Sequence, residues 1–79
     1  MEELAEQLKQ LKDQLWTEAK TDAEKLEVGA IIEAETGARN KNKHKVIEAL
    51  KKAGKWTGNV AVKIGAGIVA KLIAGSLGL

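Results

Sequence analysis

The residues of this chain that could perform acid–base or metal chemistry are few, and their spacing does not suit it. His44 is the only histidine, and the chain has no cysteine with which to complete a metal-ligand set. Glu33 and Glu35 are two positions apart, which places them on different sides of a helix and disfavours a carboxylate pair for acid–base catalysis. We therefore expect a protein that is not an enzyme and that binds no metal, cofactor or small-molecule substrate.

Two hydroxyl side chains and one glycine-rich stretch are the other candidates for chemistry. Thr57 and Ser76 have no identifiable base partner apart from the lone histidine, so nucleophilic catalysis is unsupported. The stretch Gly65-Ala66-Gly67 follows no predicted strand and opens no phosphate-binding turn. What remains is non-covalent association, which depends on how the helices of the chain present their surfaces.

Length and composition favour a single all-α domain built from aliphatic side chains. The 79 residues include no proline, phenylalanine or tyrosine and only two tryptophans. The abundant alanine, leucine, glutamate and lysine favour helix almost throughout, and we expect three or four helices in a bundle or hairpin. A core of this size is only marginally stabilising, and self-association often supplies the remainder. We therefore expect a homo-oligomer.

Leucines mark one face of an amphipathic helix at the start of the chain. Four of them are spaced by four, three and four residues, namely Leu4, Leu8, Leu11 and Leu15. This spacing places them on one stripe of a helix over residues 2–19, and Trp16 is expected to widen that face. The stripe is two heptads long, which is short for an independent coiled coil, so we expect the helix to pack in a small bundle.

A second helix is expected to begin at Thr21. The Thr21 hydroxyl can accept from the Glu24 amide while the Glu24 side chain reaches back, which is a capping box; one helix continuous with the first is the alternative. Gly29 weakens its middle by about 1 kcal/mol relative to alanine, a cost best understood if another backbone approaches there. Gly37 is predicted to cap its C-terminus. The apolar stripe continues through Ala23, Leu26, Ala30 and either Ile31 or Glu33.

The middle of the chain is basic. A polar connection leads to a third helix over residues 43–53, with Asn40 or Asn42 as its N-cap and Gly54 as a stop or bend. The first 36 residues include ten acids and four lysines, a charge of −6, and the rest include nine basic residues and one glutamate, a charge of +8. The two halves should attract each other, within one molecule or between neighbours. The single domain thus divides into acidic helices (1–37), a basic helix (38–55) and an apolar C-terminal helix (56–79).

Residues 56–79 are expected to form one helix with two distinct faces. At about 100° per residue, a broad apolar arc contains Val62, Ile64, Ile68, Val69, Leu72 and Ile73. A stripe of small residues recurs at every fourth position and contains Ala66, Ala70, Ala74 and Gly78. Because small residues at this spacing allow another helix to approach closely, we predict that self-association uses this helix-packing stripe.

The same segment is expected to contact a membrane surface or a hydrophobic protein partner. It is long enough on paper to cross a bilayer, but Lys71 would lie near the middle, at a cost of about 2.5–3.5 kcal/mol. An interfacial, pore-lining or buried core helix is therefore favoured over a solitary span. Trp56 is the expected interface anchor. The basic surface that would face an anionic leaflet comprises Arg39, Lys41, Lys43, Lys45, Lys51, Lys52, Lys55, Lys63 and Lys71.

Nucleic-acid binding and secretion are both disfavoured. The basic segment has no interleaved aromatic residues and no recognition helix, and the acidic first half would repel a phosphate backbone. The N-terminus is acidic and amphipathic, so no signal peptide is expected. We expect a protein that is cytoplasmic or peripherally associated with a membrane.

The order of motifs also resembles a known type of bacterial region. The amphipathic helix is followed by Ile32-Glu33-Ala34-Glu35, by Asn40-Lys41-Asn42-Lys43, by Val46, Leu50 and Gly58-Asn59, and by a glycine- and alanine-rich apolar end. This order is similar to a helical region of uncharacterised bacterial proteins found beside prion-like signalling motifs or in candidate defence and cell-death systems. Those regions usually have proline in the turn, where this chain has asparagine and lysine. The resemblance implies self-association and membrane-directed killing, and it assigns no catalytic residue.

Two functions of different classes are consistent with these patterns. The first is a non-enzymatic, self-associating helical protein whose C-terminal helix engages a membrane surface or a hydrophobic partner, as in a defence or cell-death module. The second is a soluble structural or adaptor bundle in which residues 56–79 form the core element.

Overall fold

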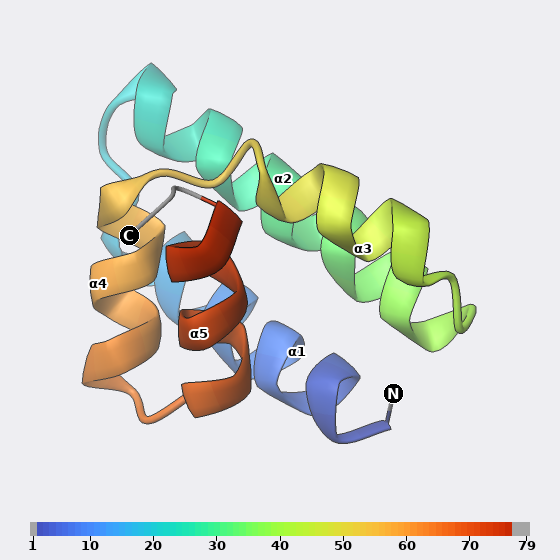
Figure 1. The fold of residues 1–79 in the computed structure, drawn as a ribbon. Helices are drawn as coiled ribbons and strands as arrows, with labels where there is room; N and C mark the ends of the chain where they lie inside the picture. The colour runs from blue at the N-terminus through green and yellow to red at the C-terminus, as the bar shows by residue number, and fades with distance from the viewer. Residues whose placement is uncertain (1, 77–79) are drawn as a thin grey trace.

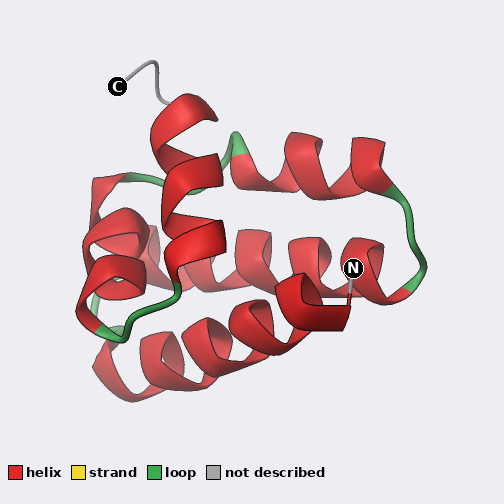
Figure 2. Ribbon diagram, turned by 60° about the horizontal axis from the view of Figure 1, so that its bottom comes forward, coloured by secondary structure: helices red, strands yellow, loops and turns green. Residues whose placement is uncertain are grey.

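The computed structural model describes residues 2–76, and this part of the chain is all-helical (Figure 1; Figure 2). Its five helices are α1 (Glu2–Glu18), α2 (Asp22–Arg39), α3 (Lys43–Leu50), α4 (Lys55–Lys63) and α5 (Gly67–Ser76). The predicted all-α class is confirmed, whereas the expected number of three or four helices is wrong. α3 is also shorter than the predicted helix over residues 43–53.

The expected single helix over residues 56–79 is divided by a turn at Gly65. Gly65 has a φ of +78°, a left-handed conformation that glycine adopts without steric cost. Its amide donates to Val62 O at 3.1 Å and the Ala66 amide donates to Ala61 O at 2.9 Å, which is the hydrogen-bond pattern of a Schellman motif. α4 therefore ends here, and α5 returns beside it in a new direction (Figure 1). Residues 56–79 therefore cannot be placed on one helical wheel, and the two faces predicted from such a wheel must be assigned separately for α4 and α5.

Two predicted helix starts are confirmed by their capping hydrogen bonds. Thr21 Oγ1 accepts from the Glu24 amide at 3.1 Å, and the Thr21 amide donates to Glu24 Oε1 at 3.2 Å. α2 is therefore separate from α1 and begins with a complete capping box. Asn42 Oδ1 accepts from the Lys45 amide at 3.1 Å, so Asn42 and not Asn40 is the N-cap of α3.

Gly37 was predicted to end its helix, but it lies inside α2. α2 continues to Arg39, and the left-handed residue that follows is Lys41, with a φ of 56°. Gly37 is buried, and a Cβ atom added to it would lie 3.1 Å from Val46 N and 3.2 Å from Lys45 Cβ. The glycine therefore serves the close packing of α3 on α2, a requirement that comes from the tertiary structure.

The core collects one apolar face from each helix. Leu8, Leu11 and Leu15 of α1 are fully buried, and Leu4 packs against them half-buried. The other helices contribute Val28, Ile31, Ala34 and Ala38 (α2), Val46, Ala49 and Leu50 (α3), Val60 and Ala61 (α4), and Val69 and Ile73 (α5). α4 and α5 are thus part of the same core as the acidic helices.

Four residues that the helical pattern assigned to packing lie outside the core. Trp16 is 57% exposed, so the predicted widening of the first face is wrong. In the predicted stripe of α2, Ala23 and Leu26 are exposed, whereas Ala30 and Ile31 are buried as predicted. Gly29 is exposed, and a Cβ atom added to it would meet nothing within 4 Å. The predicted close approach of a backbone to Gly29 is therefore not made by any part of residues 2–76.

Candidate interaction surface

The predicted apolar face of the C-terminal segment is divided between core and surface. The structure buries Val69 and Ile73, half-buries Ile64, and leaves Val62, Ile68 and Leu72 exposed. Ile68 and Leu72 are each 37% exposed and lie one turn apart on α5, so they form one apolar strip. Val62 belongs to α4, and the turn at Gly65 separates it from this strip.

The predicted small-residue stripe is largely used inside the molecule. Ala66 is buried, Ala70 packs half-buried against the core, and Ala74 is half-buried. Gly78 lies outside the described residues. On the neighbouring helix, a Cβ atom added to Gly58 would lie 3.4 Å from Ile73 Cγ2. The close packing of α5 is therefore made with helices of the same chain.

A shallow apolar groove of about 260 Å³ opens where α1, α3 and α5 meet. It is lined by Leu4, Lys43, Val46, Ile47 and Leu72, which we call the α1/α3/α5 groove. Ile47 is 47% exposed, and together with Leu72 it presents apolar surface beside the groove. Because its residues come from three segments that are far apart in the chain, no local pattern predicts it.

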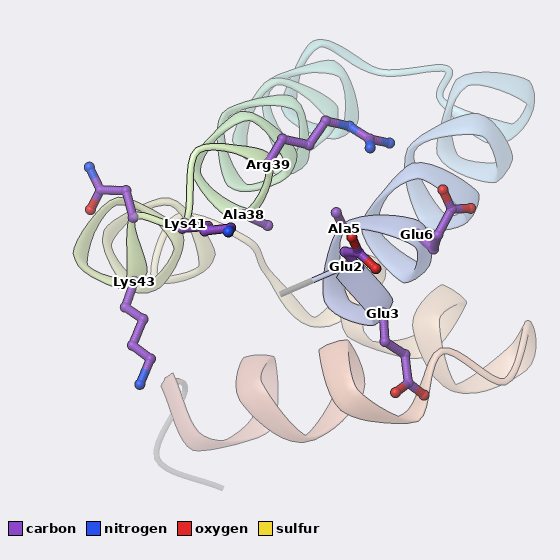
Figure 3. A pocket seen from close by; sticks show the side chains of 9 residues that line it. Glu2, Glu3, Ala5, Glu6, Ala38, Arg39, Lys41 and Lys43 are labelled. Atoms are coloured by element: carbon purple, nitrogen blue, oxygen red, sulfur yellow. The ribbon is translucent and has the colours of Figure 1, made fainter.

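Lys43 lines this groove, and Lys71 is next to Leu72 in the chain but is not one of the lining residues. Figure 3 shows the Lys43 side chain leaving α3 toward the C-terminal half of α5, and Lys71 precedes Leu72 on α5. Neither lysine forms an ion pair with any described residue. Glu3 also points toward α5 in Figure 3, so the surroundings include one negative charge. Lys43, which has no ion pair within residues 2–76, is therefore available to an anionic partner beside the groove.

The predicted basic surface is partly neutralised by ion pairs. The paired residues are Arg39 with Glu35, Lys51 with Glu48, Lys52 with Glu33 and Lys63 with Glu18. The residues without an ion pair to the described chain are Lys41, Lys43, Lys45, Lys55 and Lys71. The pairs of Lys52 and Lys63 join the basic half to the acidic half, so their attraction acts within one molecule. Exposed pairs of this kind add little stability, so they mainly orient the helices.

The residues first considered for chemistry or anchoring have ordinary positions. His44 is exposed on α3, and Glu33 and Glu35 point to different partners. Trp56, the predicted interface anchor, is half-buried and packs against the core. Its indole is therefore only partly available to a partner.

A larger open depression of about 1300 Å³ separates the first turn of α1 from the turn between α2 and α3 (Figure 3). Its charged lining residues are Glu2, Glu3 and Glu6 on α1 and Arg39, Lys41 and Lys43 across from them. Walls of opposite sign favour neither an anionic nor a cationic ligand. Within residues 2–76, no group of three or more histidine, cysteine or acidic side chains is placed to hold a metal ion.

The N-terminus of α4 is capped by a side chain from α2. Glu27 Oε1 accepts from the Gly54 amide at 2.8 Å, from the Thr57 amide at 3.3 Å and from the Thr57 hydroxyl at 2.7 Å. Gly54 cannot cap its own helix with a side chain, and the partial positive charge of a helix N-terminus stabilises a carboxylate. The hydroxyl of Thr57 is therefore a buried structural donor.

The start of α5 is fixed to α1 in a similar way. Gln7 Oε1 accepts from the Ile68 amide at 3.0 Å and from the Val69 amide at 3.4 Å. This contact holds the first turn of α5, and with it the exposed strip, beside α1. Sequence reasoning missed both Gln7 and Glu27 because each caps a helix distant in the chain. The one local indication of such a cap was Gly54, because a glycine at an N-cap has no side chain and leaves the amides of α4 to another residue.

The Glu35 carboxylate is buried between two cations. Glu35 is 9% exposed, its Oε1 lies 2.6 Å from Lys12 Nζ, and its Oε2 lies 2.8 Å from the Arg39 guanidinium. Burial alone raises the pKa of this carboxyl, but hydrogen bonds from Lys12 and Arg39 outweigh burial. The pKa of Glu35 in the folded protein is therefore lower than its ordinary value.

Acid is expected to remove the stabilisation that Glu35 provides. Because its folded pKa is depressed, this contribution is complete above the ordinary glutamate pKa of about 4.3 and is lost as the pH falls through the lower folded value. Urea unfolding of wild type and of Glu35→Gln, at several pH values from neutral to acidic, measures the stabilisation that the Glu35 carboxylate provides. The difference in unfolding free energy should be largest at neutral pH and shrink in acid. A difference that is independent of pH would contradict the assignment.

No protein-family model, curated protein or solved structure matches this chain. The resemblance to bacterial helical regions therefore stays a prediction. Within residues 2–76, no helix is long and apolar enough to cross a bilayer.

Proposed function

We propose that this protein is a non-enzymatic, self-associating helical module that binds an anionic membrane surface through the α1/α3/α5 groove and the exposed strip of α5. The observation that carries the proposal is the juxtaposition of exposed Ile47 and Leu72 with Lys43 in one groove, where Lys43 has no ion pair to a described residue. Ile68 extends this apolar surface by one turn of α5. Interfacial binding needs apolar area for the acyl boundary and cations for the headgroups. Both occur on this one surface.

The expected strength corresponds to reversible contact with the membrane surface. Each lysine near an anionic leaflet adds about 1 kcal/mol. A partly exposed leucine or isoleucine adds less than the roughly 1.5–3 kcal/mol of a fully buried side chain. Self-association would multiply this weak attraction by placing several such surfaces on one particle. The resemblance to defence and cell-death regions suggests a biological setting in which this multiplication serves membrane damage.

A structural or adaptor bundle is the second candidate, and one observation favours it. The described part of residues 56–79 contributes buried side chains to the core, namely Thr57, Val60, Ala61, Ala66, Val69 and Ile73. Under this alternative, the groove holds an apolar side chain of a protein partner and lipids have no effect on the chain.

Vesicle co-sedimentation distinguishes the two candidates. Wild type is expected to bind vesicles of phosphatidylcholine mixed with phosphatidylglycerol and to leave pure phosphatidylcholine vesicles unbound. Leu72→Glu should weaken binding about tenfold, which corresponds to about 1.4 kcal/mol, because it removes apolar contact and adds repulsion from the lipid.

Val62→Glu is the matched control, because Val62 is a 70% exposed aliphatic residue on α4 that does not line the groove. It should reduce binding less than Leu72→Glu does. If wild type ignores anionic vesicles, membrane binding is wrong and the adaptor function is favoured. Equal losses in the two variants would mean that overall charge, and not the groove, controls binding.

A further inference from the structure

Helices α4 and α5 form a hairpin that is packed mainly on itself. The two helices contact each other more extensively than either contacts any other helix, whereas α2 makes the most extensive contacts of the molecule, with α1 and α3. The described chain therefore divides into a layer of α1, α2 and α3 and the α4–α5 hairpin, which residues 51–54 connect (Figure 1). Parts that pack in this way can open separately, at a lower free energy than unfolding of the whole domain.

The hairpin and the helix on which it packs differ in charge. Residues 55–76 include Lys55, Lys63 and Lys71 and no acidic residue. α1, which contacts both helices of the hairpin, includes five acidic residues and two lysines, a charge of −3. An anionic leaflet therefore attracts the hairpin and repels α1. Because the leaflet interacts differently with the two parts, it favours a form in which they are separated.

The buried face of the hairpin would offer lipid more apolar area than the surface of the closed molecule does. Val60, Val69 and Ile73 are buried and belong to the main core. Ile47 and Leu72, the exposed apolar residues of the groove, are only partly exposed. When the hairpin leaves α1, the three buried side chains and the three lysines belong to one amphipathic unit, which is the composition of an interfacial segment.

Burial and three polar contacts hold the hairpin closed in water. Glu27 Oε1 caps the start of α4, and Gln7 Oε1 caps the start of α5. Lys63 Nζ lies 3.0 Å from Glu18 Oε2. The three acceptors belong to α1 or α2, so all three contacts are lost when the hairpin moves away. Water or lipid headgroups can then accept from the freed amides, so α4 and α5 can stay helical without these caps.

We infer that the α4–α5 hairpin is released from α1 when the protein binds an anionic membrane surface, and that Gln7, Glu18 and Glu27 hold it closed in water. The inference rests on the proposed membrane binding and adds a conformational step to it. The α1/α3/α5 groove makes the first contact with the leaflet. The hairpin then lies in the interface with its formerly buried face toward the acyl chains, while α1, α2 and α3 stay packed on one another.

A covalent link between the hairpin and α1 tests the release. The chain has no cysteine, so Glu18→Cys/Lys63→Cys contains two thiols at positions whose side chains meet in the closed form. A bismaleimide joins the two thiols, and the same variant with each thiol capped by N-ethylmaleimide is the matched control. The linked protein should bind vesicles of phosphatidylcholine mixed with phosphatidylglycerol about tenfold more weakly than the capped protein, because only the groove can contact the lipid.

Removing one cap tests the same step in the opposite direction. Gln7→Ala removes the acceptor of the Ile68 and Val69 amides. Its resistance to urea should fall, yet its vesicle binding should strengthen about threefold or more, because the open form then costs less. Thr21→Ala is the matched control, since it removes a cap from α2 and none from the hairpin. It should also lower resistance to urea, but it should leave vesicle binding unchanged.

The results separate this inference from the proposed function. If wild type does not bind the anionic vesicles, the proposed membrane binding is wrong and so is the release. If wild type binds, but the linked and capped proteins bind equally and Gln7→Ala binds no better than wild type, the release is overturned and the groove remains a rigid membrane surface. Equal gains in Gln7→Ala and Thr21→Ala would also overturn the release, because the gain would then follow from lower overall stability.

Discussion

Replacing Leu11 with alanine is expected to lower the free energy of unfolding by about 2–5 kcal/mol. Leu11 is fully buried in the middle of α1, so the substitution removes apolar contacts and leaves a cavity that the surrounding helices fill only in part. A domain of this length has about 4–12 kcal/mol of stability in total. Urea unfolding followed by circular dichroism at 222 nm should therefore show a large shift of the midpoint.

Leu26→Ala is the matched control for this change. The chemistry is the same, but Leu26 is 77% exposed on α2, so the loss should lie within about 0.5 kcal/mol. Both variants should be measured at low protein concentration, so that the proposed self-association does not contribute. Similar losses at the two positions would contradict the assignment of Leu11 to the core and of Leu26 to the surface. Should Leu11→Ala fail to fold, Leu11→Met allows the comparison, because it removes less packing.

Replacing Glu27 with alanine is expected to cost about 1–3 kcal/mol. The substitution removes the acceptor for the amides of Gly54 and Thr57 and for the buried Thr57 hydroxyl. These donors would then lie at a helix N-terminus without a protein partner. Urea unfolding gives the total loss, and hydrogen exchange of the Gly54 and Thr57 amides should become faster in the variant.

Glu27→Gln separates the hydrogen bonds from the charge. Its amide oxygen can accept from the same donors, so the loss of unfolding free energy should be smaller than for alanine. The loss that remains in Glu27→Gln measures the contribution of the negative charge at the helix N-terminus. Glu6→Ala is the control, since Glu6 is exposed on α1 and makes no hydrogen bond to the described side chains. If Glu27→Ala behaves like Glu6→Ala, the cap between α2 and α4 is not a stabilising contact.

The proposed membrane surface uses Ile47, Leu72 and Lys43. The caps from Gln7 and Glu27 hold α5 and α4 in place, so the closed form of this surface depends on contacts that are made far from it in the sequence.

The features that could be predicted depend on residues close together in the chain. The buried leucine stripe of α1, the capping box at Thr21 and the N-cap at Asn42 each follow from contacts within one or two helical turns. Within that distance the helical period and the hydrogen-bonding groups fix the geometry. The all-α class followed from the same local preferences.

Three glycines show where local reasoning was insufficient. Gly65 was assigned to a helix, yet it ends α4, because the apolar pattern continues through a turn whose two sides both face the core. Gly37 was assigned to a helix end, yet it serves the contact with α3. Gly29 was assigned to a close approach of another backbone, yet no part of residues 2–76 approaches it. Glycine permits all three roles, and only the neighbouring helices decide between them.

The sequence by itself determined the helical class, two of the helix starts, the leucine face of α1 and the opposite charges of the two halves. The tertiary structure decided where the C-terminal segment turns, which side chain caps α4, and which apolar residues remain outside. The physical reason is the range of the interactions. Caps and helical periodicity act over about four residues, whereas burial depends on helices brought together from the whole chain. The surface proposed for lipid is part of what remains exposed after that packing.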